Sequence, residues 1–220
     1  MHRSRSRSGE SATPDPAAVW RPPCPGPLPC SKFSPMFLHD PAIRAAYPNL
    51  HVGLLLLRHA HRLDLDGGPD DPADAGGSAH PVAWLCTTFA AEAGLRAAVF
   101  DLDRIAGTLQ VRFADGSEQF EDIGGGLSHL DAGEVIFIDA AGRVHARDWI
   151  TRRSPHSVLS DCTHTALVVV QARRPEPGPG VRRFLERLAG VLQAAGGAVE
   201  TLDLTLPGPR LPDAPSAAAC

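Results

Sequence analysis

The two longest apolar runs of this chain are short and lie far apart in the sequence. They are Val52–Leu57 and Ala166–Val170, and each is far below the ~20 residues that a membrane-spanning helix needs. Neither run alternates between polar and apolar residues, which is typical of strands buried on both faces. The sequence therefore predicts a sheet with protein on each side, and it indicates no membrane partner.

Capping and turn signals divide the rest of the chain into elements. Asp40-Pro41 is typical of a helix start, and Asp115-Gly116 predicts a tight turn that joins 108–113 and 118–122 in a hairpin. The expected helices are 41–47, 80–94 and 181–195, and the other expected strands are 50–58, 97–102, 133–139, 143–149, 165–172 and 199–204. Strands mostly follow one another with helices near the ends, which favours an α+β fold.

Composition sets the expected domain boundaries. Residues 1–32 are rich in Arg, Ser and Pro and are predicted to be a disordered tail, 33–206 form a single domain, and 207–220 form a flexible Pro/Ala-rich tail. No apolar segment follows the Arg/Ser start, so no secretory signal is predicted. The cysteines lack the paired spacing of a zinc ribbon, so we expect free thiols in a reducing cytoplasm, and whether Cys24 and Cys30 pair stays open.

Charge excludes one broad class of function. The net charge is −4, from 21 basic and 25 acidic residues, which argues against a general polyanion binder but leaves room for a local basic patch. Residues 143–156 hold the main basic concentration, with Trp149 between its arginines. Guanidinium groups bind phosphates and an indole ring can stack on an unpaired base. The segment is equally typical of a strand with ion-paired arginines and a core tryptophan.

Other polar patterns have structural and chemical interpretations. Asp101 and Asp103 would share one face of a strand, which suits an acid/base pair or a hard cation, although capping a turn and pairing with Arg104 is the favoured interpretation. His59 and His61 could share a metal with Asp64 or Asp66, although a polar strand end that leads into a solvated loop is the favoured interpretation.

Two further motifs are weaker. Cys162 and His164 repeat the same spacing, but a catalytic Cys–His pair does not depend on adjacency in the sequence. The run Gly124–Gly126 lacks the helix and the lysine of a phosphate loop, so it predicts a turn. No metal and no cofactor are expected.

The order of segments resembles a known family. Residues 100–114, Phe-Asp-Leu-Asp-Arg-Ile-Ala-Gly-Thr-Leu-Gln-Val-Arg-Phe-Ala, resemble the signature Phe-Asp-x-Asp-x-Ile-x-Gly-x-(apolar)-x-(apolar)-Arg-x-Ala of the B3/B4 domain in the phenylalanyl-tRNA synthetase β subunit. Gly116, Glu118 and the strand that ends at Asp139 are similar to that domain's Gly-Glu hairpin and following apolar strand. Residues 142–154 resemble the Arg/Trp-rich stretch of free-standing members, and the resemblance extends over about residues 33–206.

The resemblance implies an α+β fold with mixed, mainly antiparallel β layers packed against helices. In the synthetase this domain hydrolyses tRNA mischarged with tyrosine, so the implied partner is the aminoacylated 3′ end of tRNA and not DNA. The implied pocket residues are Asp101, Asp103, Arg112, Thr163, Thr165 and Gln171. The implied RNA-binding residues are Arg147, Trp149, Arg152, Arg153 and Ser154.

Departures from the family pattern argue against tyrosine specificity. Ala98 stands where the synthetase has an editing-site histidine, neutral Gln171 where it has an acid that recognises the tyrosine hydroxyl, and 147–149 where it has a Gly-Gly pair. No general base is assigned. The leading hypothesis is trans-editing hydrolysis of a misacylated tRNA, and the alternatives are a non-catalytic tRNA- or RNA-binding module and a small-molecule or metal-binding protein.

Overall fold

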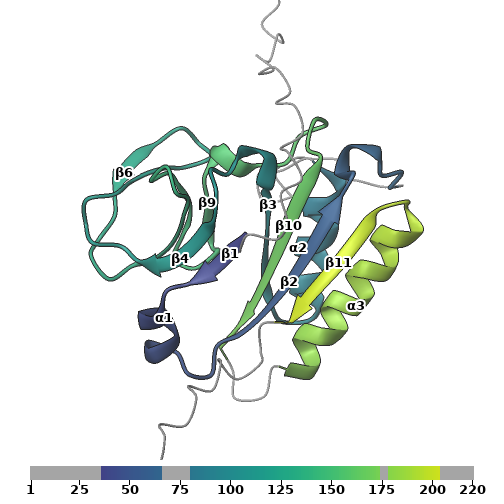
Figure 1. Cartoon of the computed structure of the whole chain (residues 1–220), viewed down its shortest axis with the longest axis horizontal. Coiled ribbons are helices and arrows are strands. Elements are labelled where there is room, and N and C mark those ends of the chain that lie inside the picture. Colours follow the sequence, from purple (N-terminus) through teal and green to yellow (C-terminus); the bar gives the residue numbers. More distant parts are fainter. Residues whose placement is uncertain (1–35, 66–79, 174–177, 204–220) are drawn as a thin grey trace, which may run out of the picture.

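The computed structural model describes residues 36–65, 80–173 and 178–203 (Figure 1). These residues contain three α-helices and eleven strands. The strands form two main sheets and a separate two-stranded hairpin. The α-helices are α1 (Pro41–Ala46), α2 (Pro81–Glu92) and α3 (Gly178–Ala194). The strands are β1 (Phe37–His39), β2 (His51–Arg58), β3 (Arg96–Asp101), β4 (Leu109–Phe113), β5 (Gln119–Glu121), β6 (Leu127–His129), β7 (Val135–Ile138), β8 (Val144–Arg147), β9 (Arg152–Arg153), β10 (Thr165–Ala172) and β11 (Ala198–Asp203). Three 3₁₀ turns are η1 (Ala60–Arg62), η2 (Leu102–Arg104) and η3 (Pro155–Ser157).

The four-stranded sheet has protein on both faces, as the apolar runs predict. Its order is β11-β2-β10-β3, with every pair antiparallel. Helices α2 and α3 cover one face, and the five-stranded sheet packs on the other (Figure 1). Gly53 lets α3 approach closely, because a Cβ there would lie 2.7 Å from side-chain atoms of Val181 and Leu185.

The five-stranded sheet has the order β1-β4-β7-β8-β9, and its only parallel pair is β1–β4. Together with the β5–β6 hairpin it forms a ring at one end of the molecule (Figure 1). Phe120 and Ile136 belong to the small apolar core inside this ring. The described residues thus have the α+β, mainly antiparallel fold that the sequence predicts.

Strand pairing around Gly116 differs from the prediction. β5 pairs with β6 across the Gly124–Gly126 turn, whereas β4 pairs with β1 and β7. Both carboxylate oxygens of Glu118 accept from the amide of Asp115, and one accepts from Gly116, at 3.1 to 3.2 Å. Arg112 pairs with the same carboxylate at 2.5 Å. The side chain of Glu118 therefore occupies the turn that a β4–β5 hairpin would need.

The predicted helices and the longer strands are confirmed. Asp40 caps α1 by accepting from the amide of Ala42 at 2.8 Å, and His80 caps α2. The short strands β1, β6 and β9 were not predicted from the sequence, because two or three residues carry no periodicity. No helix among the described residues is long and apolar enough to cross a bilayer.

Several predictions about the chain ends and the cysteines concern residues outside the described ranges. Both predicted tails, Asp66, and the cysteines Cys24 and Cys30 fall there. Of the described cysteines, Cys86 is a buried free thiol, whereas Cys162 is disulfide-bonded, so the expectation of free thiols does not hold for Cys162.

Candidate nucleic-acid interface

An open groove of about 510 Å³ lies where α2, β3, the β5–β6 turn and the start of β9 meet. Its lining residues are Thr87, Ala97, Asp122, Ile123, Gly124, Ile150, Thr151, Arg152 and Arg153. Ile150 gives the groove an apolar wall, and Thr151 contributes a hydroxyl. Only Arg152 and Arg153 belong to the RNA-binding set that the sequence indicates.

Arginines dominate the charge at this groove. Arg152 is exposed, and no ion pair or side-chain hydrogen bond joins it to another described residue. Arg153 is half-buried, and burial lowers the pKa of its guanidinium. Arg96 donates from Nη1 to the Thr151 hydroxyl, which holds that hydroxyl at the rim. The site therefore presents cationic donors beside one acid, Asp122.

A strained turn places these arginines. Asp148 and Trp149 have φ values of 45° and 61°, a region that L-residues rarely adopt and that typically costs ~1–3 kcal/mol per residue. Glycine adopts it without that cost, and the family resemblance assigns a Gly-Gly pair to this segment. Here two bulky residues form the left-handed turn, and the turn leads directly into Ile150 and Thr151.

Trp149 is a core residue and offers no free face to a base. It is 7% exposed, its ring meets Tyr47 edge-on at a centroid distance of 4.9 Å, and the Arg173 guanidinium lies 5.0 Å from its centroid. Burial of the ring holds the strained turn against the inter-sheet core. The structure therefore contradicts a stacking role for Trp149 and gives it a positioning role instead.

Two other residues of the RNA-binding set are engaged within the protein. Arg147 forms a two-pronged ion pair with Glu134, with N–O distances of 2.6 and 2.8 Å, and also donates to Ser128. Ser154 is buried and caps η3 by accepting from the amide of His156. Neither side chain is directed to the groove.

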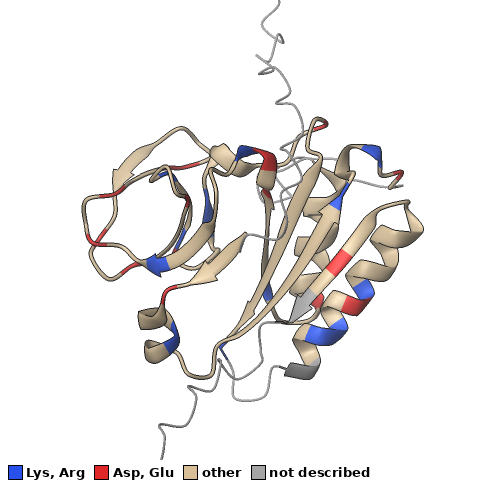
Figure 2. Cartoon of the chain, viewed as in Figure 1, with Lys and Arg blue, Asp and Glu red and all other residues tan. Residues whose placement is uncertain are grey.

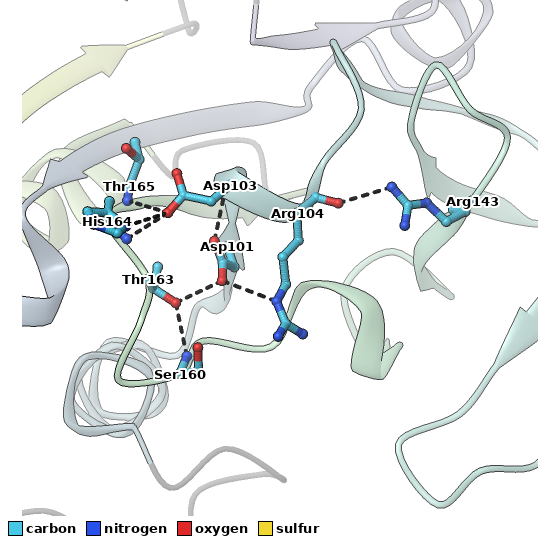
Figure 3. A network of polar contacts seen from close by, with 8 residues as sticks. All are labelled: Asp101, Asp103, Arg104, Arg143, Ser160, Thr163, His164 and Thr165. Atoms are coloured by element: carbon cyan, nitrogen blue, oxygen red, sulfur yellow. Dashed lines mark hydrogen bonds and ion pairs between the residues drawn. The ribbon is translucent and has the colours of Figure 1, made fainter. Parts of the chain in front are cut away.

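The predicted acidic pair, Asp101 and Asp103, forms a buried hydrogen-bond network rather than an open site (Figure 3). Asp101 ends β3, and its Oδ2 accepts from the Thr163 hydroxyl at 2.8 Å, while Thr163 accepts from the amide of Ser160 at 2.9 Å. Arg104 lies 3.6 Å from the same carboxylate oxygen. Burial, helped by the nearby charge of Asp103, raises the pKa of Asp101 against the opposing hydrogen bond from Thr163.

Asp103 belongs to the same hydrogen-bond network, but it lies in η2 and not in the strand. Its Oδ2 accepts from the amides of His164 and Thr165 at 2.7 and 3.3 Å (Figure 3). The expectation that both acids alternate on one strand is therefore wrong, because the strand ends at Asp101. Asp101 lies four positions after Ala97, which lines the groove, and four positions span ~13 Å along a strand. The hydrogen-bond network of Asp101 and Asp103 is therefore separate from the groove.

The inter-sheet region around Gln171 and Ala98 is tightly occupied. Gln171 is 6% exposed, with its Nε2 3.5 Å from Nε2 of His39, and Ala98 is fully buried. Burial, with a smaller effect of Arg44, lowers the pKa of His39 to about 4. Arg112, another predicted pocket residue, is held by Glu118 in the five-stranded sheet. The six predicted pocket residues thus fall into separate local networks.

Histidines gather at the end of β2. The ring centroids of His61 and His164 are 4.4 Å apart, and those of His59 and His61 are 6.4 Å apart. Burial and the neighbouring His164 lower the pKa of His61. Within the described part of the chain, no three His, Cys, Asp or Glu side chains are arranged to hold a metal ion.

Sequence reasoning missed Thr87, Asp122 and Ile123 as groove residues. They lie on a helix and on a hairpin turn that are far from Arg152 in the sequence. No motif marks them, and only the packing of α2 and the hairpin against the ring brings them together.

Comparisons with known proteins agree with this architecture. The family model described as "B3/4 domain" matches residues 89–177, which include every groove residue except Thr87. A crystal structure of an N-terminal fragment of the phenylalanyl-tRNA synthetase β subunit from Pyrococcus horikoshii is similar in fold, with a TM-score of 0.55 and 15% sequence identity. The match covers 77% of this chain and 54% of that structure, so the chain spans about half the length of the synthetase fragment. No curated protein matches the sequence. Residues 89–177 therefore resemble the B3/4 domain family, and the chain is similar in fold to the N-terminal fragment of a phenylalanyl-tRNA synthetase β subunit.

Proposed function

We propose that this chain binds the aminoacylated 3′ end of a tRNA in the groove at Arg152 and hydrolyses the ester of a misacylated tRNA in trans. The observation that carries the proposal is the groove itself. Exposed Arg152, which has no side-chain partner among the described residues, stands there beside a second arginine and an apolar wall, in the region that matches the B3/4 domain model. A cytoplasmic location fits this role and stays a prediction.

The dimensions favour a single-stranded end over a duplex. A volume of about 510 Å³ lies within the ~300–1,000 Å³ of small-ligand sites. Proteins that read duplex RNA instead span successive grooves across a broad surface. Helix α3 carries both acidic and basic residues (Figure 2), which supports local rather than extended contact with phosphates.

Hydrolysis requires little from the protein, because an aminoacyl ester is already activated. A water oxygen attacks the ester carbonyl carbon, the bond to the ribose oxygen breaks, and the proton of the water is transferred to that oxygen. The products are the free amino acid and the tRNA 3′ hydroxyl. Thr151, held by Arg96, can donate its hydroxyl to the carbonyl oxygen or to the water, which is the kind of positioned polar group that lowers such barriers.

Binding is tested first, by measuring the affinity for a tRNA acceptor-stem hairpin with a single-stranded end across a salt series. We expect affinity to fall as salt rises. Replacing Arg152→Glu should weaken binding by roughly tenfold and reduce the salt slope by about 0.7. The matched control is Arg182→Glu, which makes the same change at an exposed arginine of α3. Equal effects of the two substitutions would reject the groove as the binding site.

Catalysis is tested separately with a panel of misacylated tRNAs. We expect release of at least one amino acid above the spontaneous rate, and a slower release by the Arg152→Glu protein. If the tRNAs bind but none is deacylated, the protein is a binding module, the alternative that the sequence leaves open.

A further inference from the structure

Among the residues that the structure describes, Asp122 is the only acid that lines the groove. It follows β5 at the start of the turn of the β5–β6 hairpin, where its amide donates to the Gly126 carbonyl at 2.9 Å and its own carbonyl accepts from the Gly125 amide at 2.7 Å. These two hydrogen bonds fix the position of the residue while its side chain stays half-buried at the groove. The carboxylate therefore has a defined place in the site.

This carboxylate has no partner among the described residues. The neighbouring acid, Glu121, differs, because its Oε2 lies 3.2 Å from Nε2 of His156. No ion pair joins Asp122 to Arg152 within the described part of the chain, so these two charged groups do not neutralise one another. The groove thus presents separate anionic and cationic groups to a ligand.

A ligand that binds both the Asp122 carboxylate and the Arg152 guanidinium carries a positive and a negative group at separate positions. The end of an aminoacyl-tRNA has this character, since phosphates precede the terminal ribose and the amino acid ends in an α-ammonium group. An uncharged tRNA lacks the ammonium, and so does a tRNA whose amino acid is blocked at nitrogen. Charge-assisted hydrogen bonds of ammonium to carboxylate are stronger than neutral ones, so a carboxylate can distinguish these ends.

We propose that Asp122 binds the α-ammonium of the aminoacyl group and makes the site selective for a free amino terminus. This inference rests on the proposed function. Ile123, which is 37% exposed, and the neighbouring Ile150 line the same groove. They place apolar surface beside the carboxylate, where the side chain of the amino acid would lie.

The test uses the full chain and two acceptor-stem RNAs in which alanine is attached to the 3′ end through a stable amide. One RNA carries a free amino group and the other is N-acetylated. We expect the unmodified protein to bind the free amine about tenfold more tightly than the acetylated RNA. Asp122→Asn should bind both RNAs equally, with the affinity that the unmodified protein shows for the acetylated one.

The control is Asp131→Asn, which removes one charge at an exposed acid outside the groove and should keep the tenfold preference. Equal binding of both RNAs by the unmodified protein, or a preference that survives Asp122→Asn, overturns the inference and leaves the proposed function standing. Binding of neither RNA overturns both. Should Asp122→Asn fail to fold, Asp122→Ser replaces it, with the same expected loss of the preference and the same overturning result.

Discussion

Asp139 should be one of the most costly single residues to change in this fold. It follows β7, and its side chain is fully buried. Oδ1 accepts from the amides of Ala141 and Arg143, each at 2.9 Å. Oδ2 accepts from the amide of Ala106 at 3.1 Å and from Nε of Arg143 at 3.3 Å, and Nε2 of His145 lies 3.2 Å away. One carboxylate thus joins the β7–β8 turn to the segment before β4.

Replacing Asp139→Asn keeps one acceptor oxygen and puts an NH₂ group where the other oxygen was. Arg143, with a side chain 47% exposed, can turn to water, and His145 can change tautomer. The amide of Ala106 then faces a donor, and a buried donor without a partner costs ~1–3 kcal/mol. Loss of the charge from the remaining hydrogen bonds adds about 1 kcal/mol. We therefore expect a loss of about 2–4 kcal/mol, or roughly 4–16 °C in Tm for a domain of this size.

The pH dependence gives a second signature of the same contacts. Burial disfavours the charge on Asp139, but the amides of Arg143 and Ala106, together with His145, outweigh burial and lower its pKa below the ordinary value. A folded-state pKa below the unfolded one contributes stability above the unfolded pKa of ~3.9 and loses it as pH falls through the folded pKa. The gap between the two proteins should therefore be full at pH 7 and narrow below about pH 4.

Urea unfolding followed by circular dichroism at several pH values measures both effects. The matched control is Asp131→Asn, an exposed acid, which should stay within about 0.5 kcal/mol of the unmodified protein. If Asp139→Asn also stays within that margin at pH 7, or if its deficit is constant down to pH 3, the contacts do not stabilise the fold as argued.

Three further substitutions test other parts of the structure. Gly53→Ala should cost ~1–3 kcal/mol in thermal unfolding, because the new methyl group meets α3 at 2.7 Å; an unchanged Tm would show that α3 can move away. Arg147→Ala should cost about 1–3 kcal/mol by breaking the pair with Glu134, yet leave RNA affinity unchanged, since this guanidinium is already engaged; a tenfold weaker affinity in a folded variant would reassign it. Asp101→Asn should change the pH profile of stability, because burial raises the pKa of Asp101 in the folded state above its value in the unfolded state. The unmodified protein therefore loses stability as pH rises from the unfolded to the folded pKa, and the variant does not. Parallel urea profiles of the two proteins from pH 4 to 7 would refute this.

Local signals in the sequence were sufficient for most elements. The apolar runs correspond to β2 and β10, and the Asp40-Pro41 cap starts α1. These predictions succeed because periodicity and capping depend on residues within one or two turns of each other. The strands predicted over 133–139 and 143–149 correspond to β7 and β8, which a short turn joins.

The sequence by itself determined the three helices, the longer strands, the α+β class, and the family that the ordered motifs resemble. Only the tertiary structure decided that β5 pairs with β6, that Trp149 lies in the core, and that Asp101 and Asp103 tie β3 to the segment before β10. It alone places Thr87 and Asp122 beside Arg152. The physical reason is that a side chain's partners are set by burial and packing between elements distant in sequence, which neither spacing nor composition records.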